Sequence, residues 1–249
     1  MDMKLKNNRE NRERERETCN KSYIFVLVPP RQGSTVLYEL IASSNQTTSF
    51  LSEPIWQGEG QTLFKKSSGI DTKEYWRNRW DPEYPLNMTA VKQCYDEHWD
   101  LRKNIFVEKS PPIISRAKMY QDYFSQFGCV YFVISIRNPY GMREGLNMSP
   151  WIEYAEFQRK NIQTLSNVVI TDYAELCNNV SQVSNKIIEA IPQLECLSIA
   201  NSVKKGHDPH HTHGIVLQDK ANRMINVENR TKALNKSEEL MNFFGFQLQ

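Results

Sequence analysis

Apolar and β-branched residues gather in four short runs along the chain, and each run ends in a polar segment. The runs cover Tyr23–Val28, Ile105–Val107, Val130–Ile136 and Asn167–Thr171. Unbroken apolar runs of this length are typical of parallel strands that are buried on both faces. Apolar residues at helical spacing lie between or after them, over residues 36–41, 113–127, 140–163 and 180–191. Strands that alternate with helices predict an α/β fold of three layers, with a central, mainly parallel sheet flanked by helices.

Three segments depart from this alternation. Met1–Lys21 is charged, with alternating Arg and Glu and no apolar face, and we expect a disordered tail. Residues 22–249 are then predicted to form one domain. Within it, residues 55–104 carry Trp and Tyr among charges and prolines, which favours an aromatic-rich helical cap over a site, with some of the rings packing the cap itself. Residues 237–249 are predicted to form a last helix that ends near Gly245 and docks three aromatic rings on the core, those of Phe243, Phe244 and Phe246.

Composition excludes several classes of protein. The chain of 249 residues has a formal net charge of +2, so no strong attraction to nucleic acid follows. No apolar segment approaches the length of a membrane span, and no apolar signal region follows the first methionine. The five cysteines are odd in number and have no C-x-x-C spacing, which favours reduced thiols and a cytoplasmic location.

The first apolar run leads into a compact polar loop. Two prolines end the strand, Arg31–Thr35 reads RQGST, and a helical pattern follows from Val36. Unpaired N–H groups at a helix start, the helix dipole and a glycine that admits close approach together predict an anion site. The hydroxyls of Ser34 and Thr35 and the guanidinium of Arg31 add further donors. The loop lacks the lysine of G-x-x-x-x-G-K-[ST], which argues against a P-loop kinase that uses ATP.

The other strands also end in polar segments, where open α/β sheets place their ligand groups. These segments are FVEKSPP (106–112), VISIRNPY (133–140) and VVITDYAEL (168–176). Together with PPRQGSTVL, and in this order, they resemble the sulfotransferases that use 3′-phosphoadenosine-5′-phosphosulfate (PAPS). The 5′-phosphosulfate loop of that family commonly reads P-R-S-G-T-T-L-L or P-K-S-G-T-T. The resemblance covers most of residues 23–176 and looks nearest to the broad sulfotransferase-like and tyrosylprotein branches.

This resemblance implies a P-loop-like fold and in-line transfer of a sulfuryl group from PAPS to a hydroxyl or amine, with PAP as product and no metal. Arg31 and the amides of residues 33–35 would hold the 5′-phosphosulfate, and Arg137 would grip the 3′-phosphate. Tyr173 would contact the adenine. Lys109 would neutralise the leaving oxygen, so Lys109 and Arg31 are the predicted catalytic cations. The residues expected to bind the nucleotide are Arg31, Gln32, Gly33, Ser34, Thr35, Val36, Arg137, Gly145 and Tyr173.

A catalytic base must also accept the proton of the acceptor, within hydrogen-bond reach of it. Cytosolic members of the family use a histidine two places after the lysine, and Pro111 stands there. The tyrosylprotein branch uses a glutamate downstream of the loop helix. By that resemblance Glu53 is our first choice for the base, and Glu108 is the second.

Two departures keep an alternative open, namely a catalytically degenerate protein of the same fold that binds a nucleotide or a partner. Gln32 replaces the usual serine of the loop. Gly145 stands eight positions after Arg137, where the family usually has serine, and Asn147 or Ser149 would have to replace it. The acceptor stays open among a glycan, a peptidyl tyrosine, a lipid and a small hydroxyl compound.

A histidine-rich stretch, from His207 to His213, suggests zinc at first sight. Its histidines have no helical spacing and no neighbouring cysteine. We therefore predict a loop there and no metal site.

Overall fold

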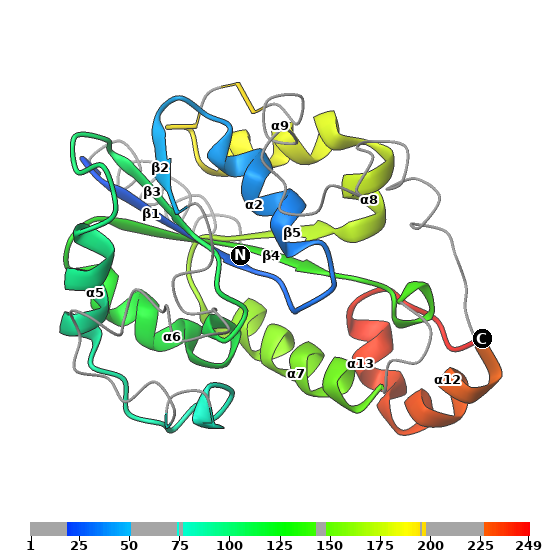
Figure 1. Ribbon diagram of the computed structural model, residues 1–249. Coiled ribbons are helices and arrows are strands. Elements are labelled where there is room, and N and C mark those ends of the chain that lie inside the picture. Colours follow the sequence, from blue (N-terminus) through cyan, green and yellow to red (C-terminus); the bar gives the residue numbers. More distant parts are fainter. Residues whose placement is uncertain (1–18, 51–73, 75–76, 143–147, 195, 198–226) are drawn as a thin grey trace, which may run out of the picture.

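The chain folds around one wholly parallel sheet. The computed structural model describes residues 19–50, 74, 77–142, 148–194, 196–197 and 227–249. Within them, five strands pair in the order β2-β3-β1-β4-β5. The strands are β1 (Ser22–Leu27), β2 (Thr47–Ser49), β3 (Ile105–Glu108), β4 (Cys129–Ile136) and β5 (Val168–Asp172). The predicted α/β fold with a central parallel sheet is thereby confirmed (Figure 1).

Strand β1 shows how the sheet is buried on both faces. Tyr23, Phe25 and Leu27 belong to the apolar cluster on one face, while Ile24 and Val26 belong to the cluster on the other. Successive side chains of a strand point to opposite faces, so an unbroken apolar run feeds both clusters.

Helices cover both faces of the sheet (Figure 1). One layer holds α2 (Ser34–Ala42), α8 (Tyr173–Asn178) and α9 (Val180–Ala190). The opposite layer holds α5 (Met88–Asp96), α6 (Ile113–Phe124) and α7 (Ser149–Thr164). A third apolar cluster joins η1 (Pro139–Gly141) and the start of α7 to the C-terminal helices α12 (Val227–Leu234) and α13 (Glu238–Phe243), between which lies η3 (Asn235–Ser237).

A disulfide closes the amino edge of the sheet. Cys19, ahead of β1, is bonded to Cys129, the first residue of β4. Beside it, the Cys129 N–H donates to the Lys21 carbonyl (3.0 Å), and a Cβ on Gly128 would lie 2.3 Å from that oxygen. The expectation of reduced thiols is wrong for this pair, because adjacent strands bring together cysteines that are 110 residues apart. Since disulfides persist in oxidising compartments, the cysteines no longer favour a cytoplasmic location.

Aromatic rings fill the core beneath the same edge. Tyr23 stacks on Phe106 with ring centroids 5.1 Å apart, and Trp99 lies 5.0 Å from Phe106 and 4.9 Å from Tyr95. Tyr95 and Trp99 belong to the segment for which the sequence predicts a cap. Both are buried and pack the core of the domain.

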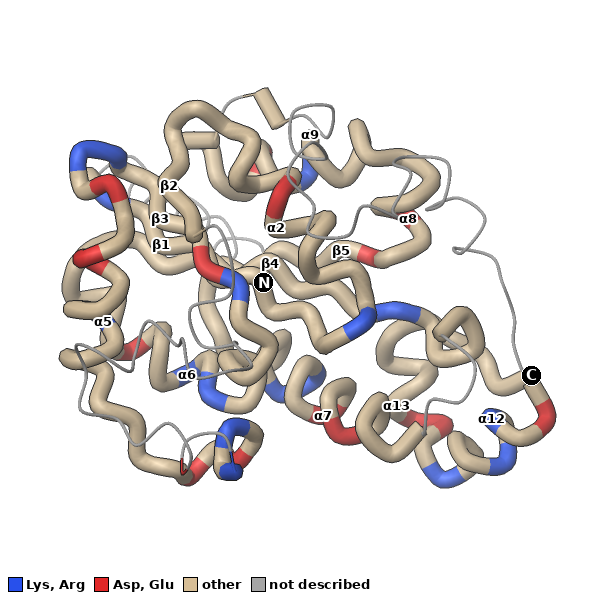
Figure 2. The backbone as a smooth tube through the Cα atoms, viewed as in Figure 1, with Lys and Arg blue, Asp and Glu red and all other residues tan. Residues whose placement is uncertain are grey.

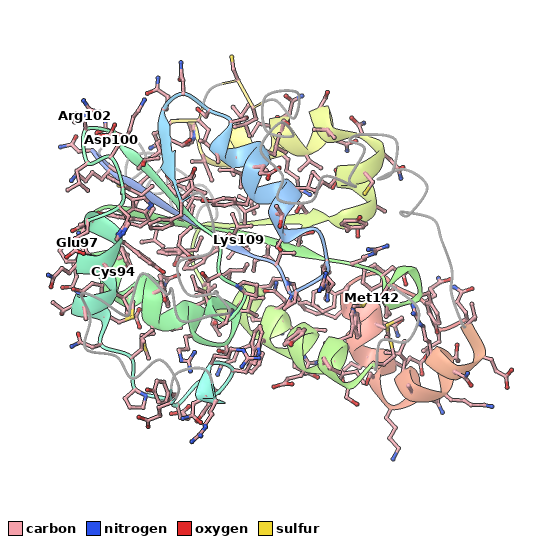
Figure 3. The ribbon with its side chains drawn as sticks, in the orientation of Figure 1. Cys94, Glu97, Asp100, Arg102, Lys109 and Met142 are labelled. Carbon is pink, nitrogen blue, oxygen red and sulfur yellow. A yellow bond between two sulfur atoms is a disulfide. The ribbon has the colours of Figure 1, made fainter. Side chains whose placement is uncertain are left out.

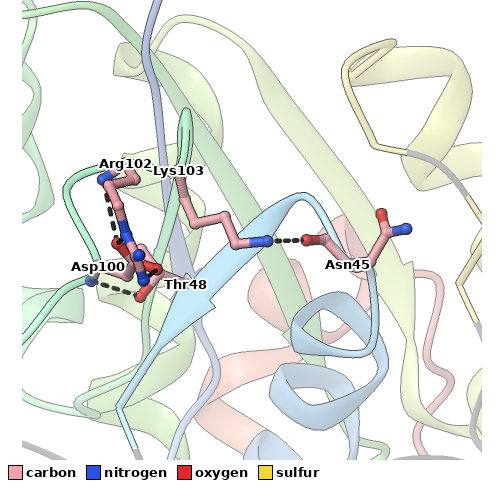
Figure 4. A network of polar contacts seen from close by, with 5 residues as sticks. All are labelled: Asn45, Thr48, Asp100, Arg102 and Lys103. Carbon is pink, nitrogen blue, oxygen red and sulfur yellow. Dashed lines mark hydrogen bonds and ion pairs between the residues drawn. The ribbon is translucent and has the colours of Figure 1, made fainter.

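A polar network fastens the short strand β2, which the sequence does not distinguish from a loop (Figure 4). The Asp100 N–H donates to the Thr48 hydroxyl (2.9 Å), and Lys103 donates to the Asn45 carbonyl. Arg102 donates to both carboxylate oxygens of Asp100, and these hydrogen bonds lower the pKa of Asp100 to about 2. The network ties β2 to the segment that enters β3.

The C-terminal helix ends close to the predicted position. It ends at Phe243, two residues before Gly245, whose φ of 74° is left-handed. Phe244 and Phe246 pack on the third cluster as expected. Phe243 is 40% exposed, so the prediction that its ring docks on the core is wrong.

Candidate functional site

Four polar segments meet at the carboxyl edge of the sheet. They follow β1, β3, β4 and β5, and β1 lies between β3 and β4 in the sheet. Since all the strands are parallel, their carboxyl ends share one edge. Figure 2 shows basic residues where the chain leaves β3 and where it leaves β4.

The loop between β1 and α2 contains two residues with a left-handed backbone conformation. Arg31 has a φ of 65° and Gly33 a φ of 91°. Gly33 is the N-cap of α2, and no side chain caps this helix start. The first turn of α2 carries no acidic residue. The amides at the start of α2 therefore keep their attraction for an anion.

Gly33 is required by contact as well as by conformation. A Cβ on Gly33 would lie 2.5 Å from two ring carbons of Tyr173, the first residue of α8. Only a residue without a side chain lets the loop after β1 lie this close to the end of β5. The side chain of Asp172 accepts from the amides of Ala174 and Glu175, which starts α8 at Tyr173.

Arg137 connects three of the four segments. Its backbone N–H donates to the Gln32 side-chain oxygen (3.0 Å), and its guanidinium lies 4.3 Å from the centre of the Tyr173 ring. The guanidinium also donates to the Gly141 carbonyl, and the Arg137 carbonyl accepts from the Trp151 indole (2.9 Å). The loop after β1, the turn after β4 and the start of α8 are thus in direct contact.

Burial gives this junction its electrostatic character. Desolvation lowers the pKa of Arg137, although an arginine stays protonated in proteins. Burial raises the pKa of Tyr173 to about 12 and also raises the pKa of the Cys177 thiol. The phenol and the thiol are therefore neutral at ordinary pH. Neither of these two groups therefore places a negative charge beside the Arg137 guanidinium.

Gln32 is fully enclosed in this junction. It is 1% exposed, and its side-chain oxygen is occupied by the Arg137 N–H. Its side-chain nitrogen has no hydrogen-bond partner among the described residues. A buried amide donor without an acceptor is costly, and an anionic oxygen from a ligand would satisfy it.

Lys109 marks the end of β3 on the other side of β1, and Figure 3 labels it near the middle of the molecule. It is 6% exposed, and its ammonium lies 6.0 Å from the centre of the Tyr38 ring on α2. The neighbouring Glu108 is fully buried, and its carboxylate accepts from the Ser110 hydroxyl (2.5 Å). Burial raises the pKa of Tyr38, and the charge of Glu108 adds to that shift.

The predicted site residues divide into three groups. Gln32, Gly33, Arg137 and Tyr173 are brought together by direct contact, and Lys109 contacts the helix that follows the first loop. Four others lie in or beside the loop, with Ser34 buried, Val36 half-buried, and both Arg31 and Thr35 exposed. Several residues that the sequence brings into question lie outside the described part of the chain: Glu53, Gly145, Asn147 and the histidines from His207 to His213.

Two side chains at this edge are absent from the sequence prediction. Trp151 donates its indole N–H to the Arg137 carbonyl, whereas the sequence pattern indicates only a core residue. Arg230 on α12 is 4% exposed and donates to the carbonyls of the turn after β4. No local pattern around Arg230 indicates this contact, because the turn is about 90 residues away in sequence.

Two kinds of feature are not found among the described residues. They contain no group of three or more His, Cys, Asp or Glu side chains arranged to hold a metal ion. None of the helices in this part of the chain has both the length and the apolar character to cross a bilayer.

Comparison with known proteins places the fold. No family model and no curated protein matches the chain in sequence. Solved sulfotransferases match it in structure. The sulfotransferase from Alicyclobacillus acidocaldarius has a TM-score of 0.53 and 12% identity over 90% of this chain and 96% of its own. Sulfotransferase STF9 from Mycobacterium avium has a TM-score of 0.52 and 13% identity over 96% of this chain and 81% of its own.

The sulfotransferase domain from the curacin biosynthetic pathway gives a TM-score of 0.51 and 11% identity, over 92% of this chain and 99% of that domain. At sequence identities this low, the structural similarity shows the fold alone. The protein has the sulfotransferase fold, as the four segments predict.

Proposed function

We propose that the protein is a sulfotransferase that moves a sulfuryl group from PAPS to a hydroxyl or amine acceptor. The observation that supports this most is the junction of Gln32, Gly33, Arg137 and Tyr173. In it, two loops with anion-binding chemistry are held in contact at one edge of the sheet. The donor carries anionic groups at its 5′ and 3′ ends, so it needs two such sites at a fixed separation.

Different residues bind the different parts of this donor. The amides of residues 33–35 and the guanidinium of Arg31 hold the 5′-phosphosulfate, and the Gln32 amide nitrogen adds a buried donor beside them. Arg137 grips the 3′-phosphate. Tyr173 is neutral and lies against the guanidinium, where its ring contacts the adenine without adding charge.

Catalysis then depends on position and charge. The acceptor oxygen bonds to sulfur as the bond from sulfur to the bridging oxygen breaks, and the electron pair of that bond leaves with the 5′-phosphate of PAP. Lys109 stabilises the charge that develops on the bridging oxygen, as fixed cations do in related transfers. The acceptor proton passes to a glutamate, with Glu53 as first choice and Glu108, beside Lys109, as second. No metal is assigned to this mechanism. The acceptors considered are a glycan, a peptidyl tyrosine and a small hydroxyl compound.

The test is transfer of labelled sulfate from PAPS over a panel of these acceptor classes. We expect Lys109→Ala and Arg137→Ala each to lower the rate by about 10²–10³-fold, the usual loss on removal of one group that stabilises transition-state charge. Lys118→Ala on the surface of α6 and Arg159→Ala on α7 are matched controls and should keep the wild-type rate. Wild-type transfer by a well-folded Lys109→Ala variant would contradict its role.

A second candidate is a protein that binds the nucleotide without catalysis. The sequence departures at Gln32 and Gly145 favour it. Calorimetry with PAP separates the candidates, because tight binding without transfer to any acceptor supports the second. Absence of PAP binding would contradict both.

A further inference from the structure

The turn after β4 is held by an arginine that lies about 90 residues further along the chain. Arg230 on α12 donates from Nη1 to the carbonyls of Pro139 (2.5 Å) and Tyr140 (2.9 Å). It donates from Nη2 to the carbonyl of Met142 (3.0 Å). The remaining carbonyl of the turn, that of Gly141, accepts from Arg137. The guanidinium groups of Arg230 and Arg137 therefore donate, between them, to four successive carbonyls. Figure 3 labels Met142 in this turn, near the C-terminal helices.

The contact is enclosed and supported on both sides. Arg230 is 4% exposed and Tyr140 is fully buried. The Tyr140 hydroxyl lies 2.9 Å from the Thr231 hydroxyl, and the Gln249 N–H donates to the Tyr140 hydroxyl (3.1 Å). Apolar side chains of the third cluster surround the turn, among them Met142, Trp151 and Leu234. The guanidinium is therefore a fixed internal part of this edge.

From this arrangement we propose that Arg230 is a positioning residue for Arg137, and that it sets the preference of the site for a nucleotide with a 3′-phosphate. The inference rests on the proposed function, in which Arg137 grips that phosphate. With Arg230 in place, three of the four carbonyls accept from its guanidinium, and the turn holds the Gly141 carbonyl where Arg137 donates to it. Without Arg230, the carbonyls of Tyr140 and Met142 lose this donor, and that of Pro139 keeps only the Met142 N–H (3.3 Å), which is costly in an enclosed turn. The turn would then shift, and the Gly141 carbonyl that orients Arg137 would shift with it.

A lysine cannot replace this arginine. Its ammonium is a compact charge, whereas the planar guanidinium presents five donors in a fixed fork. Arg230→Lys therefore keeps the charge of the site and removes the geometry. Arg230→Met removes both.

The experiment compares two nucleotides, PAP and adenosine 5′-phosphate, by calorimetry on the full chain. The dissociation constant of adenosine 5′-phosphate divided by that of PAP reports the contribution of the 3′-phosphate. We expect Arg230→Met and Arg230→Lys to lower this ratio at least tenfold while the dissociation constant of adenosine 5′-phosphate changes less than twofold. Arg159→Met is the matched control. It removes an arginine that links α7 to Glu239 on α13 without touching the turn, and it should keep the wild-type ratio.

Each outcome decides the matter. A wild-type ratio in both folded Arg230 variants overturns the inference and leaves the proposed function standing. Equal weakening of both nucleotides in a folded variant also overturns it, because Arg230 would then support the fold in general. If Arg230→Met does not fold, Arg230→Lys carries the test. If the wild-type protein itself does not distinguish the two nucleotides, the role of Arg137 in the proposed function fails first.

Discussion

The two edges of the sheet are built from different chemistry. At the amino edge, a disulfide, a tight backbone contact at Gly128 and the stacked aromatic rings of Tyr23 and Phe106 close the core. At the carboxyl edge, the left-handed loop residue Gly33 and the half-buried Arg137 both lie against Tyr173, and the buried Lys109 lies beside α2. The amino edge gains stability from burial and covalent closure, whereas the carboxyl edge keeps desolvated donors that suit an anionic ligand. Substitutions at the two edges should therefore separate stability from ligand binding.

Gly33→Ala should give the largest effect on binding. The new Cβ would lie 2.5 Å from the Tyr173 ring, at a φ that disfavours any side chain. We expect PAP affinity to fall by about 100-fold or more, since displacement of a site by about 1 Å costs that much. Gly245→Ala is the matched control, because it shares a positive φ but has no heavy atom within 4 Å of the new Cβ. Equal PAP affinity in the two variants would contradict the close packing of the carboxyl edge.

Loss of the disulfide should act on stability alone. Cys129→Ser opens a covalent loop that spans 110 residues, which lowers the free energy of unfolding by about 4–5 kcal/mol in the chain-entropy model. Chemical denaturation measures the loss, with Cys196→Ser, an exposed cysteine outside the disulfide, as control. The folded Cys129→Ser protein should bind PAP within twofold of wild type. A large loss of affinity would mean that the two edges are not independent.

Gln32→Met should give a smaller loss of binding. Methionine matches the length of glutamine and removes both the acceptor for the Arg137 N–H and the buried donor. A hydrogen bond to a charged group contributes about 1.5–3 kcal/mol, so PAP affinity should fall by about 10-fold or more. Gln126→Met, at an exposed position two residues after α6, is the control in the calorimetric titration. Unchanged affinity in the Gln32 variant would remove this residue from the site.

The alkaline titration of two tyrosines gives the smallest effect. Burial raises the pKa of Tyr23 at the amino edge and of Tyr173 at the carboxyl edge, each to about 12. A raised folded pKa means that the stabilising contribution is complete below the unfolded value of about 10 and is lost as pH rises toward 12. Tyr23→Phe and Tyr173→Phe should each flatten that decline in the free energy of unfolding.

PAP distinguishes the two phenols. Its negative charge disfavours a phenolate nearby, so saturating PAP should raise the pKa of Tyr173 and leave that of Tyr23 unchanged. Because the chain has 11 tyrosines, the ultraviolet titration of each Phe variant is subtracted from that of the wild type, with and without PAP, to give the phenol that the variant lacks. A PAP-dependent shift of Tyr23 would contradict the assignment of the ligand to the carboxyl edge.

The sequence predicts the centre of the fold well and its margins poorly. Strands β1 and β4 are unbroken apolar runs, because parallel strands in the middle of a sheet are buried on both faces. Strand β2 reads TTS and has no such run, because it lies at the edge and is fastened by polar contacts. The disulfide joins residues that only the folded sheet brings together. Neither feature has a local pattern that would reveal it.

The candidate site shows the same division. The glycine–hydroxyl loop and the strand-end segments are local patterns, so Gly33, Lys109, Arg137 and Tyr173 are found from sequence. The start of α8 could also have been predicted. Asp172 is followed three residues later by Glu175, and this spacing is a helix-capping pattern. The contacts of Arg230 and of the Gln32 side chain span about 90 and 105 residues, and only the fold brings them into reach.

The most direct test of the account is the structure of the protein in complex with PAP. We predict that the 5′-phosphate lies on the amides of Ser34 and Thr35, and that the 3′-phosphate accepts hydrogen bonds from the Arg137 guanidinium. Lys109 should lie within reach of the 5′-phosphate oxygen that bridges to sulfur in PAPS. A nucleotide bound away from the carboxyl edge, or one whose 3′-phosphate does not contact Arg137, would contradict the central claim.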